Sequence, residues 1–146
     1  LLLTNAPADR HPDHGRAGQL VKEAAFYAGL PKVETLAEDG RAQPSWRPHM
    51  VYQFIQFYYL TPHIVVDIKA QSEKKMEAVM AYKSQFFNED SNEQDTILTR
   101  PGFFEMLRAR WREMGAAAHL EMGEGFLSDR TVAVDNLLQL PYNGSA

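Results

Sequence analysis

Apolar side chains recur at three- and four-residue spacing after Gly15, which is the pattern of one face of a helix. The residues that form this face are Ala17, Leu20, Val21, Ala24, Ala25 and Ala28. Gly29 followed by Pro31 is a helix stop signal. Residues 31–48 are polar and rich in turn formers, so we predict a loop there.

Two more helices are predicted downstream. The first lies between Ser72 and Phe87, with Ser72 as its N-cap. The second begins at about Pro101, because proline suits a first helical turn, and Gly115 loosens or ends it. The acidic stretch Asn88–Thr99 between them is predicted to be a surface loop. The apolar positions of the two helices are Met76, Val79, Met80, Tyr82 and Phe86 in one and Phe103, Phe104, Leu107, Trp111 and Met114 in the other.

Strands are predicted from short β-favouring runs at Leu1–Thr4, Met50–Tyr58, Ile64–Ile68 and Leu120–Phe126. The continuous β-branched run Ile64–Ile68 indicates a strand buried on both faces, as in a parallel sheet. A final apolar segment covers Val134–Leu140. Strands that alternate with helices predict an α/β layered fold.

The amino-acid composition excludes several classes of function. The 146 residues suit one domain with a real core, and 45% of them are hydrophobic. A net charge of −4 argues against a general nucleic-acid partner. The apolar runs are too short to cross a membrane. The chain has no cysteine, which excludes thiolate metal sites and is typical of a reducing compartment, so we expect a cytoplasmic protein.

The densest chemical cluster is the run Asp9-Arg10-His11-Pro12-Asp13-His14, between the first strand and the first helix. Imidazole and carboxylate are the zinc ligands open to a chain without cysteine. Ligands of open α/β sheets bind beyond the carboxyl ends of the strands, which is where this loop is predicted to lie. A plain structural explanation also exists, in which Asp13 only caps the helix and Arg10 only pairs with a surface carboxylate.

The same run, followed by Ala17 and Leu20-Val21, resembles a motif of the LmbE/PIG-L family of zinc-dependent de-N-acetylases, and most of all the bacillithiol biosynthesis deacetylases. Further similar segments follow in order along nearly the whole chain. They are Glu23-Ala24-Ala25-Phe26, Arg47-Pro48, Val65-Val66-Asp67-Ile68, Lys74-Lys75-Met76-Glu77-Ala78, Ala81-Tyr82-Lys83-Ser84-Gln85-Phe86, Arg108-Ala109-Arg110 and Gly123-Glu124-Gly125-Phe126.

The resemblance implies a Rossmann-like three-layer fold with a mostly parallel sheet. It implies a hydrolase that removes the acetyl group from an N-acetylglucosamine conjugate, such as N-acetylglucosaminyl-malate. In this comparison His14 is a Zn²⁺ ligand, His11 stabilises the tetrahedral intermediate, and Arg10 contacts the substrate. Asp13 orients a neighbouring imidazole. Members of the family form multimers, so a homo-oligomer is expected.

One departure from the family pattern concerns the amino-terminal side. The family carries two more zinc ligands and the general base in an early His-Pro-Asp-Asp type motif, and no such run precedes His14 here. We therefore expect residues 1–146 to be the carboxy-terminal portion of a single deacetylase-like domain, inactive alone. A second departure is Met122, where relatives often carry tyrosine.

Two alternatives stay open. The chain could be a non-catalytic module that keeps the fold and serves association, for example through the aromatic run Phe54–Tyr59. It could also be another metal-assisted hydrolase, acting on phosphoesters. His49, His63 and His119 are isolated in the sequence, so we expect them to be ordinary surface residues.

Overall fold

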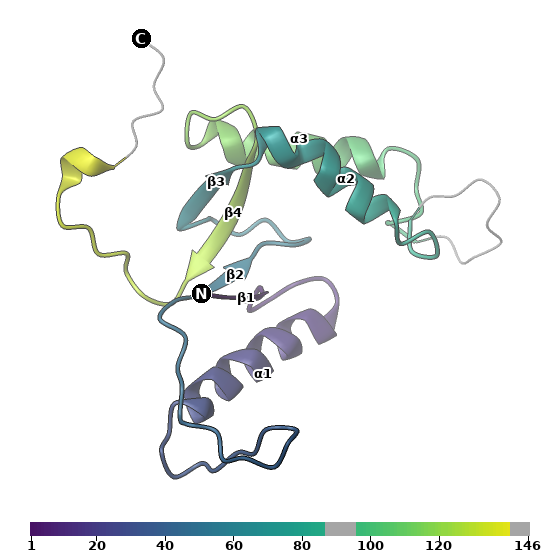
Figure 1. The fold of residues 1–146 in the computed structure, drawn as a ribbon. Coiled ribbons are helices and arrows are strands. Elements are labelled where there is room, and N and C mark those ends of the chain that lie inside the picture. Colours follow the sequence, from purple (N-terminus) through teal and green to yellow (C-terminus); the bar gives the residue numbers. More distant parts are fainter. Residues whose placement is uncertain (87–95, 141–146) are drawn as a thin grey trace. The chain divides into compact units, whose positions relative to one another are not determined.

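The computed structural model describes residues 1–86 and 96–140, and these form an α/β fold (Figure 1). The strands are β1 Leu2–Asn5, β2 Val51–Phe54, β3 Ile64–Asp67 and β4 Gly123–Ser128. The helices are α1 Pro12–Ala28, α2 Ser72–Met80 and α3 Phe103–Ala116, with short 3₁₀ turns at η1 Lys69–Gln71 and η2 Leu137–Gln139. The chain divides into two compact units, residues 1–64 with 125–135 and residues 65–124 with 136–146.

The four strands form one sheet in the order β1-β2-β4-β3. β1 pairs with β2 in parallel, with Thr4 opposite Gln53, and β2 pairs with β4 in the antiparallel sense. The predicted α/β class is confirmed, and the sheet is mixed. The mixture arises because β4 runs against β2, a direction that a strand's own sequence does not encode.

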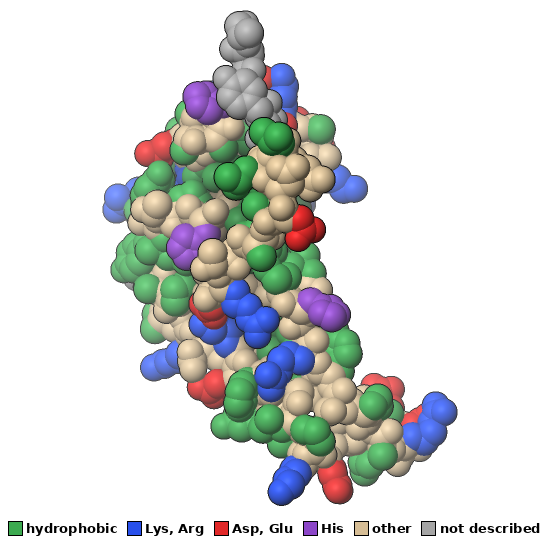
Figure 2. All heavy atoms as spheres, turned by 90° about the vertical axis from the view of Figure 1, so that its left-hand side faces the viewer, with side chains coloured by type: hydrophobic (Ala, Val, Ile, Leu, Met, Phe, Trp, Pro, Cys, Tyr) green, Lys and Arg blue, Asp and Glu red, His purple; other side chains and the backbone are tan. Residues whose placement is uncertain are grey.

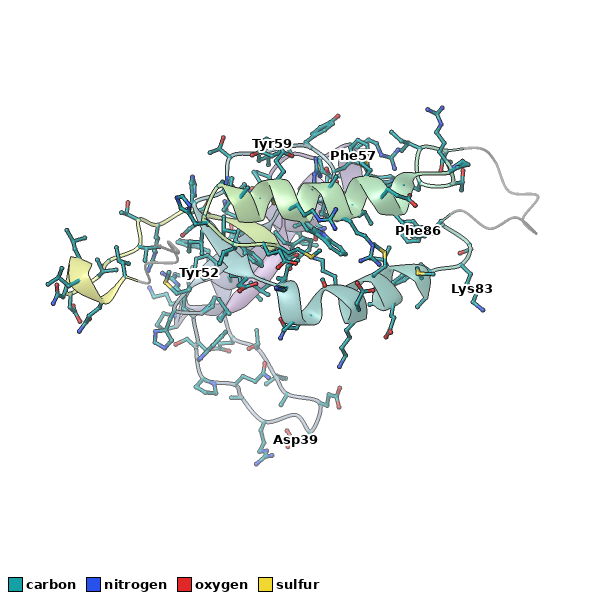
Figure 3. All side chains as sticks on the ribbon, turned by 90° about the horizontal axis from the view of Figure 1, so that it is seen from above. Asp39, Tyr52, Phe57, Tyr59, Lys83 and Phe86 are labelled. Atoms are coloured by element: carbon teal, nitrogen blue, oxygen red, sulfur yellow. The ribbon has the colours of Figure 1, made fainter. Side chains whose placement is uncertain are left out.

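The first unit is built around α1 and the β1–β2 pair. Gly18 is the buried residue of α1, and a Cβ there would lie 2.6 Å from the carbonyl oxygen of Asn5. The absence of a side chain at Gly18 therefore lets the helix lie directly on the end of β1. Figure 3 shows Asp39 at the tip of the loop that joins α1 to β2.

The predicted start of α1 at Gly15 is three residues late. Pro12 occupies the first helical turn, where its fixed φ and missing N–H are harmless, and His11 is the N-cap. The apolar face is also less buried than its pattern indicates. Leu20 is 66% exposed and Tyr27 is 53% exposed.

β3 differs from the prediction of a strand buried on two faces. It is one of the two edge strands of the sheet, and its residues are half-buried or exposed, with Val66 47% exposed. An outer strand has a neighbour on one side only, which a β-branched run does not reveal. The other strands are shorter than predicted or shifted, since β2 ends at Phe54 and β4 begins at Gly123.

The second unit has its own hydrophobic core under α2 and α3. Ile68, Met76, Trp111 and Met122 form the buried cluster. Gly115 of α3 meets Gly123 of β4 so closely that a Cβ on Gly115 would lie 2.8 Å from the Gly123 nitrogen. Tight helix–strand contact therefore sets the position of α3 in this unit.

Both later helices are confirmed, with altered ends. Ser72 is the first residue of α2 and not its cap, and its hydroxyl donates to the carbonyl of Lys69. α3 begins two residues after Pro101 and continues one residue past Gly115. The predicted loop Asn88–Thr99 lies largely outside the described residues. No helix within residues 1–86 and 96–140 is long and apolar enough to cross a membrane.

Candidate functional site

The Asp9–His14 run lies at the carboxyl end of β1, where it leads into the first turn of α1. Pro12, Asp13 and His14 are the first three helical residues, so their position follows from the helix start. The close packing of Gly18 against Asn5 fixes that turn against the strand. The sequence prediction of a strand–loop–helix setting for this run is confirmed.

The strongest contact in the run joins Asp9 to His14. The Asp9 Oδ2 atom lies 2.5 Å from the His14 Nδ1 atom. The other carboxylate oxygen, Oδ1, accepts hydrogen bonds from the backbone N–H groups of Phe57 at 2.8 Å and Tyr58 at 3.0 Å. Asp9 thus ties the imidazole to the segment after β2.

Burial and hydrogen bonding act in opposite directions on Asp9. Its side chain is 1% exposed, and burial raises the pKa of a carboxyl group. Hydrogen bonds from His14 and from the backbone of Tyr58, Phe57 and Arg10 favour the ionised form and outweigh burial, so the pKa of Asp9 lies below its usual value. Asp9 is therefore a carboxylate at neutral pH.

This carboxylate selects the form of the His14 ring. A carboxylate can only accept, so a neutral His14 carries its proton on Nδ1 and leaves the Nε2 lone pair for another partner. The His14 side chain is 39% exposed. An imidazole oriented by a buried carboxylate is the arrangement that protein zinc sites use repeatedly.

His11 lies beside His14, with ring centroids 5.5 Å apart. The His11 Nδ1 atom accepts from the backbone N–H of Asp13 at 3.3 Å, so the neutral ring carries its proton on Nε2. The Asp13 carboxylate is 3.7 Å from the same nitrogen and 3.3 Å from the Arg16 guanidinium. Asp13 therefore lies near the imidazole of His11, while the carboxylate bonded to His14 is Asp9.

Arg10 completes the cluster from the solvent side. Its guanidinium carbon lies 5.3 Å from the centre of the Phe57 ring. The position of Phe57 in the segment after β2 can be followed in Figure 3. A cation over an aromatic face is held in place while its N–H groups stay free to contact an anion or a hydroxyl.

The structure thus brings Arg10, His11, Asp13 and His14 together, as predicted, and adds Asp9. Sequence analysis assigned no role to Asp9, although it belongs to the same run. Within the described residues no group of three or more His, Asp or Glu side chains is arranged to hold a metal ion. The cluster offers one oriented imidazole and a second imidazole that donates from Nε2.

The other residues considered in the sequence analysis lie outside the Asp9–His14 run. The Nδ1 atom of His63 accepts from the backbone N–H of Ser128 at 2.9 Å, so this histidine joins two chain segments. Glu124 pairs with Lys75 at 2.5 Å, and Met122 is buried in the core of the second unit. Tyr58 and Tyr59 are about half exposed, at 48% and 51%.

Comparison with known proteins gives a sequence relative and several structural ones. No family model matches the chain. Over 81 residues the chain is 38% identical to the diacetylchitobiose deacetylase of Thermococcus kodakarensis. That stretch is 55% of this chain and 28% of the relative, so the chain spans well under half of the relative's length.

Solved structures share the fold over most of this chain. A conserved protein, TT1542, from Thermus thermophilus matches with a TM-score of 0.72 and 27% identity over 90% of this chain and 52% of its own. An N,N'-diacetylchitobiose deacetylase from Pyrococcus horikoshii, complexed with its inhibitor MPG, matches with a TM-score of 0.63 and 25% identity. The latter match covers 85% of this chain and 43% of that one.

The fold alone does not select the chemistry. GalB, a 4-carboxy-2-hydroxymuconate hydratase from Pseudomonas putida KT2440, matches with a TM-score of 0.66 at 19% identity, over 92% of this chain and 54% of that one. A shared scaffold can carry different reactions. Two of the proteins that this chain is similar to, in sequence or in structure, are diacetylchitobiose deacetylases. The bacillithiol assignment stays a prediction.

Proposed function

We propose that the protein is a zinc-dependent deacetylase of N-acetylated amino-sugar conjugates and that residues 1–146 supply its Asp9–His14 cluster. The observation that carries the proposal is the pairing of the buried Asp9 carboxylate with His14 at the carboxyl end of β1. The similarity to two diacetylchitobiose deacetylases supports the reaction class.

The donor set fits zinc in part. His14 offers Nε2 as a ligand because Asp9 holds its Nδ1 proton. Catalytic zinc takes three protein ligands and a water, so the proposal requires at least one further ligand from outside the described residues. Bound zinc would lower the pKa of its water toward neutrality and polarise the amide carbonyl.

His11 is suited to donate a hydrogen bond to the developing oxyanion and a proton to the leaving amine. Its Nε2 proton can be donated to the oxygen on which negative charge develops, because the Asp13 backbone N–H occupies Nδ1. The nearby Asp13 carboxylate lies 3.7 Å from Nδ1 and is placed to orient the ring. His11 and Asp13 are thus the proposed catalytic pair of this chain.

Arg10 is the proposed substrate contact. Its guanidinium is exposed and held over Phe57. A guanidinium binds carboxylates in a two-point geometry. This preference suits a sugar that carries a carboxylate-bearing group, and we propose N-acetylglucosaminyl-malate as the substrate to test first.

A second function is favoured by one observation. Tyr58 and Tyr59 are about half exposed, so a non-catalytic module that keeps the fold and associates through them is the competing proposal. Such a module would retain its stability and its association when His11 and His14 are replaced. The exposed Tyr58 and Tyr59 would then serve contact between copies.

The test is metal content and acetate release, measured on residues 1–146 and on the product of the complete reading frame. The deacetylase proposal expects zinc near one per chain and acetate release from N-acetylglucosaminyl-malate in the complete product, with neither in residues 1–146 alone.

Two variants of the complete product separate the roles. His14→Ala is expected to lose zinc and turnover together. His11→Ala is expected to keep zinc and lose roughly a hundredfold in kcat, the usual worth of a positioned acid or oxyanion donor. A complete product without zinc and without acetate release would instead support the non-catalytic module.

A further inference from the structure

A cavity of about 230 Å³ lies in the first unit, at the end of α1 away from His14. Its walls come from the last turns of α1, the residues that enter β2, and the segment that leaves β4. Lys22 in its wall is eight residues beyond His14, or about 12 Å along the helix axis. The cavity is therefore separate from the Asp9–His14 cluster.

Positive charge dominates its wall. Three cationic side chains, Lys22, Arg47 and Arg130, line the cavity together with one carboxylate, that of Asp129. Figure 2, which shows the molecule from the left-hand side of Figure 1, has Lys and Arg side chains grouped near the middle of that face. An excess of positive charge in a hollow attracts anions.

The three cationic side chains differ in how many of their N–H groups already have a partner in the protein. Lys22 pairs with Asp129 at 2.6 Å, so its charge is largely balanced. Arg47 donates to the carbonyl of Phe26 at 3.0 Å and lies 5.0 Å from the centre of its ring, which leaves further N–H groups for a ligand. The guanidinium of Arg130 has no hydrogen-bond or ion-pair partner among residues 1–86 and 96–140.

Most of the remaining wall is apolar, and His49 and Ser128 are its other polar residues. Phe26, Pro48, Met50 and Val51 line this part, and Phe26 is 55% exposed. The volume lies just below the usual range for drug-sized ligands, so it suits a smaller molecule. A wall that combines apolar and cationic residues matches a ring or short chain that carries one anionic group.

We propose that this cavity binds a small organic anion, with a carboxylate or phosphate held by Arg130 and Arg47 and its apolar part against Phe26 and Met50. The two guanidinium groups can each offer paired N–H donors to such an anion. The Lys22–Asp129 pair joins α1 to the segment after β4 and so forms one side of the cavity.

The proposal is tested by NMR titration of the 146-residue protein with phenyl phosphate and, in a separate series, benzoate. The expected result is saturable shifts of the backbone amides of Val51, Asp129 and Arg130, and the tighter of the two probes identifies the anionic group. Phenol and inorganic phosphate are the matched probes that lack one half of the ligand, and each is expected to bind at least fivefold more weakly.

Two arginine variants then distinguish binding in this cavity from a general effect of the protein's positive charge. Arg130→Gln is expected to weaken the tighter probe at least tenfold, while Arg112→Gln on α3, which removes the same charge outside the cavity, changes binding less than twofold. Equal weakening by both variants, or shifts that do not saturate at these three amides, would overturn the proposal. The measurement involves no metal and no turnover, so its result tests the cavity proposal independently of the proposed deacetylase activity.

Discussion

Asp9 uses both of its carboxylate oxygens as hydrogen-bond acceptors, one toward His14 and the other toward the backbone after β2. The two side chains are five positions apart in the chain, and the carboxylate is 1% exposed while the imidazole is 39% exposed. The orientation of the imidazole is thus set by a buried neighbour, which the solvent cannot readily replace.

Asp9→Asn is expected to reverse the proton position on His14. An amide has one acceptor and one donor end, so it cannot satisfy three donors as the carboxylate does. If its NH₂ group turns toward His14, Nδ1 becomes the acceptor and the proton moves to Nε2. Nitrogen-15 NMR of the histidine rings would detect the change, and zinc affinity of the complete product is expected to fall by roughly 10–100-fold.

The matched control is Asp13→Asn, which makes the same chemical change on an exposed carboxylate in the same run. It should leave the His14 proton on Nδ1. If both variants leave the His14 ring unchanged, the role of Asp9 in orienting it is refuted.

Acid is expected to remove the stabilising effect of Asp9. Its pKa is lower in the folded protein than in the unfolded chain, so its contribution is present above the unfolded pKa of about 4 and disappears as the pH falls through the lower folded value. Urea midpoints of the protein and of Asp9→Asn, measured from pH 7 to pH 2.5, should differ at neutral pH and converge in acid. A constant difference would contradict this.

Thr4 is a buried residue whose hydroxyl is unsatisfied. It is 3% exposed, and its Oγ1 atom has no hydrogen-bond partner within the part of the chain that the structure describes. Thr4→Val replaces the hydroxyl by a methyl group of similar shape and is expected to raise the free energy of unfolding by about 1 kcal/mol.

Thr4→Ser is the control for that substitution, because it keeps the hydroxyl and removes the methyl group. It should lower the free energy of unfolding by about 1 kcal/mol. Urea unfolding measures both variants, and a Thr4→Val protein less stable than the original would mean that the hydroxyl is satisfied.

Gly18→Ala is expected to destabilise the first unit although alanine favours helices. The new Cβ would meet the Asn5 carbonyl oxygen at 2.6 Å and that of Ala6 at 3.2 Å. Overpacking of this kind costs about 1–3 kcal/mol, which exceeds the helix gain of about 1 kcal/mol. Gln19→Ala, at the exposed neighbouring position, should change the urea midpoint little.

Sequence patterns were sufficient for the elements and their order. The three helices and four strands lie close to where periodicity and β-branched runs predicted them. The ends were missed where local hydrogen bonds decide them. His11 caps α1 through its ring, and histidine is not a residue that cap statistics favour.

The sequence predicted that the residues of the Asp9–His14 run form a cluster, but it did not predict that Asp9 is the carboxylate that pairs with His14. Asp13 is nearer to His14 in the chain than Asp9, but Asp9 makes the contact because the loop turns its carboxylate inward against the backbone of Phe57 and Tyr58. Those two N–H groups lie 48 and 49 positions away in sequence, so no local pattern encodes them. The same holds for the cavity, whose cations come from three distant segments.

The contact between Gly115 and Gly123 has a consequence for how this protein can vary. A Cβ on Gly123 would lie 2.9 Å from the Gly115 Cα and 2.4 Å from a methyl group of Val65, so neither glycine can accept even a methyl group while the other backbone stays in place. A methyl group at either position would force the two backbones apart, so each single substitution is expected to destabilise the protein. In a library of random single variants selected for folded protein, both codons should remain almost entirely glycine.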